Sequence, residues 1–228
     1  MCFSATASFG AGVVLSVIGA ATIKKAIHPS QIPFAAIPLI FAVQQVAEGF
    51  LWLALTYPGY AFLQGFTTYI FLSFAQIIWP FYVPVAIFLL QGKEKRTISK
   101  ILVSIGAIVS LYLAYCLLSY PVEATITGHH IAYRQDYPAA LDYYTGMLYI
   151  IATILPAFFS PVKYMRFLGA AIFISYIITQ LFYTGYIVSV WCFFASVIRI
   201  IVFIITATFK KTDHALLRFT LKNESWLK

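Results

Sequence analysis

A carboxylate, two amides and an indole occur at helical spacing within one apolar stretch of the sequence, residues 32–55. Gln44, Glu48 and Trp52 follow one another at steps of four, so a helix would place them on one face. Gln45 lies three residues before Glu48 and flanks the same stripe. Ionisable groups inside a bilayer are costly and are usually functional. The stripe is therefore a candidate site, in which Glu48 would bind a cation, a proton or a polar group of a ligand.

A second polar stripe runs through the last apolar stretch and ends at Arg199. Ser189, Cys192 and Ser196 precede this arginine at steps of three, four and three. Both stripes are expected to face the interior of a helix bundle rather than lipid. If the two helices are neighbours, Arg199 can pair with Glu48 directly or through water. The alternatives are a purely structural ion pair and an arginine that extends toward the cytosolic interface.

Thiol, imidazole and carboxylate groups fall on one predicted side of the membrane, and together they suggest a metal site. The candidate ligands are Cys2, Glu48, His130 and Cys192. No spacing motif supports them, because the sequence has no CxxC pair and no HxxxH on a predicted helix. Two other uses of the thiols stay open: a Cys2–Cys192 disulfide in an oxidising compartment, and a buried thiol that serves as a small apolar side chain. A metal is thus one hypothesis for a cofactor.

Further glutamines and tryptophans supply what a ligand pocket needs. Gln76 and Gln180 can donate and accept hydrogen bonds, and Trp79 and Trp191 can form apolar walls, although core packing is the commoner use of such tryptophans. We expect an outward-opening site between the second, third, sixth and seventh apolar segments. The candidate ligand-binding residues are Gln44, Gln45, Glu48, Trp52, Gln76, Trp79, Gln180, Trp191, Cys192 and Arg199.

The elements that must position these residues are membrane helices. Of the 228 residues, 62% are hydrophobic and only 10% are charged, whereas a soluble domain carries roughly 25% charged residues. A spanning helix needs ~20 mostly apolar residues, and polar breaks separate seven such segments. The predicted segments are residues 8–22, 32–55, 62–90, 98–119, 141–159, 167–183 and 187–208. Residues 121–138 are predicted to be a polar loop, and Pro80 and Pro84 should kink or tilt the third segment.

Basic residues give the predicted orientation. Lys and Arg concentrate in cytosolic loops, and 13 of the 15 basic residues fall in the odd-numbered loops and the tail. This alternation predicts an all-α bundle of seven transmembrane helices in a bacterial inner membrane, with the N-terminus outside and the C-terminus cytosolic. Residues 1–209 would form the transmembrane domain and residues 210–228 a basic tail. The helix directions are compatible with a 3+1+3 arrangement. The net charge of +8 is thus a topology signal and does not indicate a nucleic-acid partner.

The opening peptide Met1-Cys2-Phe3-Ser4-Ala5 resembles the start of an uncharacterised bacterial family of multi-pass membrane proteins. Residues 32–39, 44–49 and 190–194 resemble segments of the same family, so the resemblance covers most of the chain. It implies membership of a family of unknown function and brings no activity with it. It does select the same residues as the physical reasoning.

Three functions are compatible with these features. The leading hypothesis is a small-solute transporter or ligand-binding protein with a polar intramembrane site. The second is a membrane-embedded enzyme, with or without a metal, that acts on a lipid-like substrate; the lack of histidines in the predicted helices disfavours it. The third is a structural subunit of a membrane complex, whose basic tail would lie on anionic lipid or dock a partner. The expected partners are the bilayer and a small ligand; the oligomeric state stays open.

Overall fold

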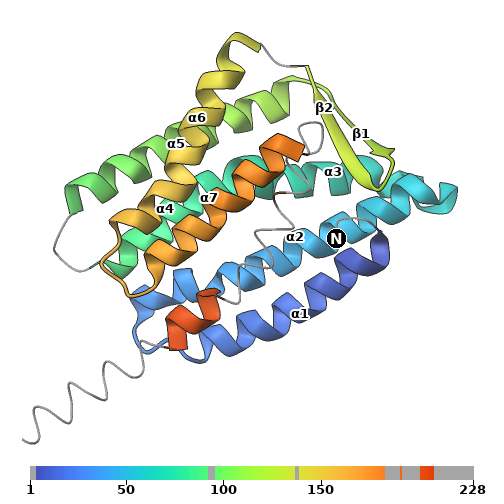
Figure 1. Cartoon of the computed structure of the whole chain (residues 1–228). Coiled ribbons are helices and arrows are strands. Elements are labelled where there is room, and N and C mark those ends of the chain that lie inside the picture. The colour runs from blue at the N-terminus through green and yellow to red at the C-terminus, as the bar shows by residue number, and fades with distance from the viewer. Residues whose placement is uncertain (1–3, 92–95, 137–138, 183–190, 192–200, 208–228) are drawn as a thin grey trace, which may run out of the picture.

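The computed structural model describes residues 4–91, 96–136, 139–182, 191 and 201–207, and helices make up most of this part of the chain (Figure 1). Short 3-10 turns at Pro29–Gln31 and Pro58–Leu63 precede the second and third helices, and residues 201–207 are also helical. The long helices are α1 (Ala5–Ile23), α2 (Ile32–Thr56), α3 (Gln64–Leu72), α4 (Trp79–Leu90), α5 (Arg96–Ser119), α6 (Ala139–Phe159) and α7 (Met165–Phe182).

Several of these helices are suited to a membrane. Within the described part of the chain, five helical segments are long and apolar enough to cross a membrane: Ala5–Ile23, Pro29–Thr56, Pro58–Leu90, Thr97–Ser119 and Met165–Phe182. A shorter apolar helix covers Tyr144–Phe159. Large apolar side chains also point outward, among them Leu118 at 83% and Phe182 at 74% exposure. Such surfaces are expected where lipid covers the helices.

The predicted seventh segment and the basic tail fall mostly outside the described residues. Of residues 187–208, the structure describes Trp191 and the helical residues 201–207. The tail at 210–228 is not among the described residues. The six earlier predicted segments are helical, whereas the seven-helix bundle and the 3+1+3 arrangement stay predictions.

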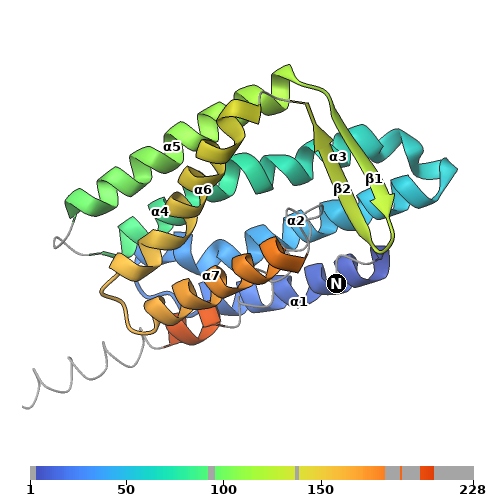
Figure 2. The same cartoon turned by 45° about the horizontal axis from the view of Figure 1, so that its top comes forward.

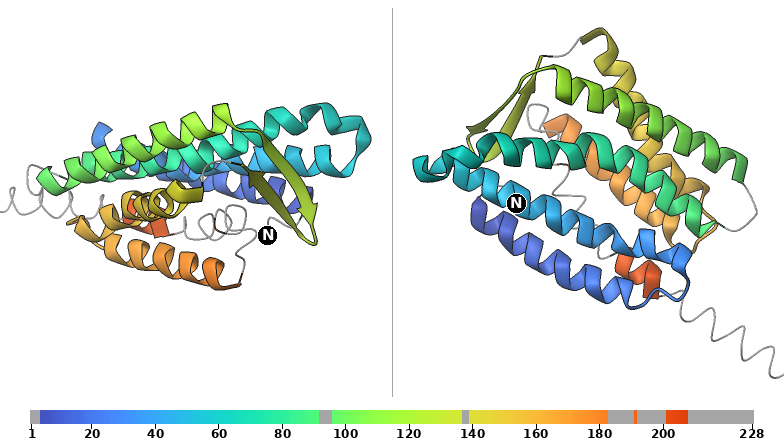
Figure 3. Two further views of the ribbon diagram at one scale, coloured as in Figure 1. Left: turned by 90° about the horizontal axis from the view of Figure 1, so that it is seen from above. Right: turned by 180° about the vertical axis from the view of Figure 1, so that it is seen from behind.

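The helices form two layers. In Figure 3, α1, α2, α3 with α4, and α5 lie side by side in one layer, and α6 and α7 cross one of its faces. Contacts agree with this view, since α6 packs on α4 and α5 and α7 packs on α6. The largest apolar cluster brings together residues from both layers, including Phe34 and Phe41 of α2, Trp79 of α4 and Met165 of α7.

Glycines allow α1 to lie very close to α2. A Cβ at Gly19 would be 2.7 Å from the backbone nitrogen of Leu39, and one at Gly12 would be 2.9 Å from a methyl carbon of Val46. Small residues at such positions let two helix backbones approach one another in membranes. This contact fixes α2, the helix that carries the first polar stripe.

The third predicted segment is one continuous run of helix with an irregular centre. A π-helical segment, Ser73–Ile78, joins α3 to α4 just before Pro80. Proline has no N–H to donate within a helix, and a π turn also disturbs the regular bonding. Neighbouring side chains bond two carbonyls here: the Tyr149 hydroxyl donates to the Ala75 oxygen at 2.6 Å, and the Ser110 hydroxyl to the Ile77 oxygen at 2.7 Å.

The segment predicted to be a polar loop contains a β-hairpin instead. Residues 121–138 contain strands β1 (Val122–Thr127) and β2 (His130–Gln135), which pair antiparallel with Thr127 opposite His130. Gly128 in the turn has φ of 62°, which suits a two-residue hairpin. The hairpin lies across the end of the bundle near the start of α1 (Figure 2). Ala124 and Ile131 pack against the α2 residues Leu51 and Trp52, and this burial stabilises strands in an otherwise polar segment.

Candidate functional site

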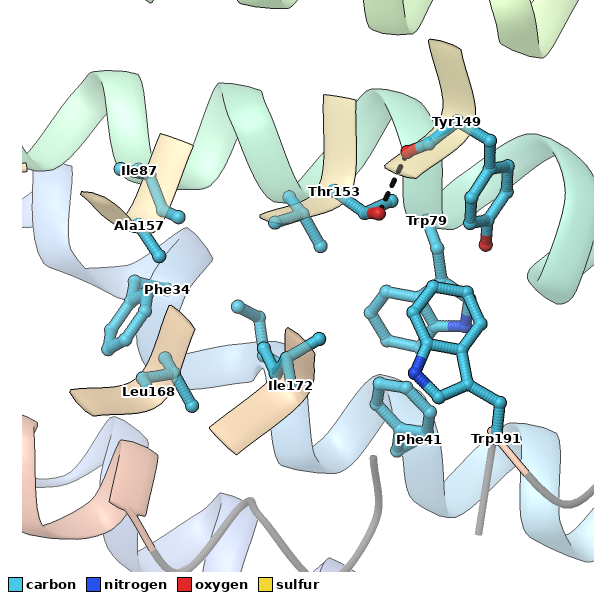
Figure 4. A pocket seen from close by; sticks show the side chains of 12 residues that line it. Phe34, Phe41, Trp79, Ile87, Tyr149, Thr153, Ala157, Leu168, Ile172 and Trp191 are labelled. Carbon is cyan, nitrogen blue, oxygen red and sulfur yellow. Dashed lines mark hydrogen bonds between the residues drawn. The ribbon is translucent and has the colours of Figure 1, made fainter. Parts of the chain in front are cut away.

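A pocket lies between α2, α4, α6 and α7, with one wall from Trp191 (Figure 4). Its volume is ≈ 50 Å³. A single water needs only about 10–15 Å³ by the same kind of measure, so the space is larger than one water. Its lining is mostly apolar and aromatic: Phe34, Ile37, Phe41, Trp79, Val83, Ile87, Tyr149, Thr153, Ala157, Leu168, Ile172 and Trp191.

One wall of the pocket is an aromatic pair held by an amide. The rings of Phe41 and Trp79 stack with centroids 3.8 Å apart and planes 17° from parallel. The indole Nε1–H of Trp79 donates to Oε1 of Gln44 at 2.7 Å. Gln44 has no exposed surface. A buried tryptophan usually finds a partner for its N–H, so this bond sets the orientation of the ring that the pocket sees.

The opposite wall comes from α6, α7 and Trp191. Trp191 meets the ring of Tyr149 edge-on at 5.7 Å and that of Tyr176 at 5.5 Å. The hydroxyl of Thr153 donates to the Tyr149 carbonyl at 2.8 Å (Figure 4). Because the Tyr149 hydroxyl also donates to Ala75 of the π-helical segment, this tyrosine joins the pocket to the irregular part of the third segment.

A buried polar pair lies farther along α2. Nε2 of Gln45 donates to Oε2 of Glu48 at 3.1 Å, and neither residue has exposed surface. Glu48 is one helical turn beyond Gln44 and is not among the pocket-lining residues. Trp52, one turn further, belongs to the cluster beneath the hairpin. The first polar stripe is thus buried along its length, and it runs from the pocket toward the hairpin.

The remaining candidate ligand-binding residues are spread over other places. Nε2 of Gln76 donates to Oε1 of Gln135 at 3.0 Å, which ties the π-helical segment to β2. Gln180 is on the exposed surface of α7, where its Oε1 lies 3.5 Å from the Tyr176 hydroxyl. Neither glutamine lines the pocket. Cys192 and Arg199 lie outside the described residues.

The predicted metal site stays a prediction. Among the described residues, no three His, Cys, Asp or Glu side chains come together in a group that could hold a metal ion. Two of the four predicted ligands, Cys2 and Cys192, lie outside those residues, as does any disulfide between them. The other two belong to different elements, with Glu48 in α2 and His130 in β2. Burial and the nearby charge of His129 lower the pKa of His130, which favours the neutral imidazole.

Several pocket residues were not predicted from the sequence. Phe34, Ile37 and Phe41 continue the face of Gln44 and Glu48 at steps of three and four, so the stripe itself indicated them. On α6, Tyr149, Thr153 and Ala157 follow one another at steps of four. Their spacing marks a common face, but nothing in the sequence shows which neighbour that face meets.

Helices able to span a membrane, apolar outer surfaces and polar groups buried between helices are the features of a multi-pass helical membrane protein. The chain belongs to the family described as Family of unknown function (DUF6629), whose model matches residues 1–216. The predicted membership of an uncharacterised family is therefore confirmed. No curated protein and no solved structure matches the chain.

Proposed function

We propose that this protein is a ligand-binding protein of the bacterial inner membrane that holds a small, mainly apolar solute in the pocket between α2, α4, α6 and α7. The observation that carries the proposal is the pocket itself: a preformed space with stacked aromatic walls and few polar groups. Ligand sites are usually concave, largely preformed and mostly apolar, with a few placed polar groups. The proposed site therefore lies about two turns of α2 before Glu48, the residue around which the sequence predicted a polar site.

The membrane orientation in this proposal has seven helices, the N-terminus outside and the C-terminus in the cytosol. Lys24 and Lys25 follow α1, and Lys163 and Arg166 lie where α6 gives way to α7. Figure 1 shows these two connections at one end of the bundle and the hairpin at the other. Basic connections at a shared end support a cytosolic assignment for that end. Phe34 of α2, Ile87 of α4 and Leu168 of α7 lie near that end of their helices, so the pocket would occupy the cytosolic half of the bundle.

The size of the pocket favours binding over transport. Its volume of ≈ 50 Å³ is about a third of the ~150 Å³ apolar cavity that binds benzene. The ligand should therefore have only a few non-hydrogen atoms, unless side chains move. Small apolar molecules enter a bilayer readily, because transfer of apolar surface out of water is favourable. Such a solute needs no carrier to cross the membrane, whereas a protein that detects or retains it needs a pocket.

The test is a titration of protein in lipid nanodiscs with isobutene, an apolar molecule of four non-hydrogen atoms. The sequence has four tryptophans, so ¹⁵N labelling gives four indole resonances, which Trp→Phe substitutions assign. Saturable shifts are expected for Trp79 and Trp191, which line the pocket, and not for Trp52, which lies beneath the hairpin.

A matched pair of variants on α7 shows whether such shifts come from the pocket. Ile172→Trp fills the pocket and should abolish saturable binding. Ile174→Trp makes the same change on a side chain that is 58% exposed, so it should leave binding intact. If no resonance shifts saturably in the unsubstituted protein, or if both variants bind equally, the proposal is wrong.

A further inference from the structure

Among the described residues that line the pocket, four side chains have a hydrogen-bond donor, and three of these donors are already used. The Trp79 indole donates to Gln44. The Tyr149 hydroxyl donates to the Ala75 carbonyl, and the Thr153 hydroxyl to the Tyr149 carbonyl. The fourth donor is the indole Nε1–H of Trp191, which is buried and has no hydrogen-bond partner among the described residues.

This donor belongs to a wall of the pocket, and because its nitrogen has essentially no accessible surface, a neighbouring side chain must shift slightly for a bound molecule to reach it. Trp191 lines the pocket, and Figure 4 shows its nitrogen on the edge of the ring toward Ile172, another lining residue. A buried N–H without an acceptor loses its bond to water and gains nothing in return. A ligand that brings an acceptor to this nitrogen recovers that bond and still buries apolar surface against Phe41 and Ile172.

We propose that the ligand is a small, mainly apolar molecule with one hydrogen-bond acceptor, such as a carbonyl or ether oxygen, which binds the Trp191 indole N–H. The inference rests on the proposed function, because it assigns a chemical class to the occupant of the same pocket. The described lining contains no charged side chain, so an ionic ligand would lose its hydration without a counter-charge. A ligand whose main polar group is a donor would compete only for the oxygens of Thr153 and Tyr149.

Water is a less suitable occupant than such a ligand. A buried water typically makes about three hydrogen bonds and needs at least two polar partners. Among the described lining residues the unused donor is on Trp191, the hydroxyl oxygens of Thr153 and Tyr149 are the side-chain acceptors, and most of the remaining surface is aliphatic or aromatic. A molecule with a single acceptor and an apolar body matches that distribution more closely.

The experiment compares two probes of nearly the same shape, acetone and isobutene, in which a CH₂ group replaces the carbonyl oxygen; each has only four non-hydrogen atoms. Both are titrated into ¹⁵N-labelled protein in nanodiscs, and affinities are referred to the concentration of each probe in the lipid. Acetone should bind about 3- to 10-fold more tightly, as expected for one net hydrogen bond. It should also move the Trp191 indole proton downfield, whereas isobutene should not.

Internal controls separate this inference from the proposed function. The Trp79 indole is already bonded to Gln44, so its proton should show no downfield shift specific to the ketone. Trp191→Phe keeps an aromatic wall but lacks the donor, and it should bind both probes equally. If this variant fails to fold, the two probes on the unsubstituted protein still decide the matter.

Each outcome has one meaning. Tighter binding of the ketone with a downfield Trp191 proton supports the inference. Saturable binding of both probes with equal affinity and no downfield shift overturns the inference and leaves the proposed function in place. Absence of saturable binding by either probe overturns the proposed function, and the inference with it.

Discussion

The indole Nε1 of Trp79 in α4 lies 2.7 Å from Oε1 of Gln44 in α2, and both residues are buried. The same indole stacks on Phe41, three residues before Gln44. The same face of α2 therefore stacks on the ring of Trp79 and accepts the hydrogen bond from its Nε1–H. This arrangement fixes the distance between two neighbouring helices and the shape of the pocket wall at once.

Replacing Gln44 by Leu should destabilise the fold, because it leaves the Trp79 N–H buried without this acceptor. A loss of about 1–3 kcal/mol in the free energy of unfolding is expected, measured in mixed micelles. The matched comparison is Gln44→Leu combined with Trp79→Phe. With both polar partners gone, the double variant should lose less than the sum of the two single variants. Additive losses would show that the bond contributes nothing.

At Glu48 a replacement that keeps a hydrogen-bond acceptor should be tolerated better than an apolar one. Glu48→Gln keeps an oxygen that can accept from Gln45, whereas Glu48→Leu leaves that amide without this acceptor inside the bundle. We expect Leu to be less stable than Gln by about 1–3 kcal/mol, measured by unfolding in micelles of the same composition. Equal stability of the two variants would contradict a structural role for the Gln45–Glu48 bond.

Gly106 should not tolerate even a methyl group. It lies where α5 meets α4, and a Cβ there would overlap the carbonyl oxygen of Pro80. Gly106→Ala is expected to cost about 1–3 kcal/mol, as for other overpacked sites. Gly10→Ala in α1 is the control, since no atom lies within 4 Å of its Cβ position and alanine favours helix. Thermal unfolding should rank Gly106→Ala clearly below Gly10→Ala, and the opposite order would contradict this packing.

Stability of the hairpin should fall as the pH is lowered. Burial lowers the pKa of His130 in the fold, whereas the unfolded chain has the ordinary value of about 6.5. Well above pH 6.5 both states are neutral, and below it the unfolded state takes up the proton first, so the fold is disfavoured. Hydrogen exchange of the hairpin amides at pH 7.5 and 5.0 would measure this effect. His130→Gln should remove the part that comes from this titration, and an unchanged difference would assign it to another group.

The helices could be predicted from the sequence because the spans are long, apolar and separated by charged or turn-forming residues. The predicted 32–55 became α2, Ile32–Thr56, and the polar breaks at Lys24 and Lys25 fall at the end of α1. The hairpin was not predicted, because its segment is polar in composition. Val122, Ala124 and Ile126 nevertheless alternate with other residues, and Gly128 supplies a turn. Its strands are stable where Ala124 and Ile131 meet Leu51 and Trp52, a contact that only the fold supplies.

The candidate site could be predicted only in part. Helical spacing grouped Gln44, Glu48 and Trp52, all of which are buried. Trp79 and Trp191, which the sequence suggested as apolar walls, line the pocket. Spacing within one helix says nothing about which helices meet. For that reason Tyr149 and Thr153 of α6 were missed, and Gln180 was included although it lies on the exposed surface of α7.

The number of residues in the π-helical segment decides which way the side chains of α4 face, whatever those residues are. In a regular α-helix, side chains three residues apart share a face, yet Gln76 reaches β2 while Trp79 reaches α2. A π turn holds extra chain per turn, so losing one residue between Ser73 and Ile78 would rotate all of α4 by about 100°. Among relatives, a one-residue gap in this segment should therefore coincide with loss of the Gln–Trp pair, even where every other residue of α4 is identical.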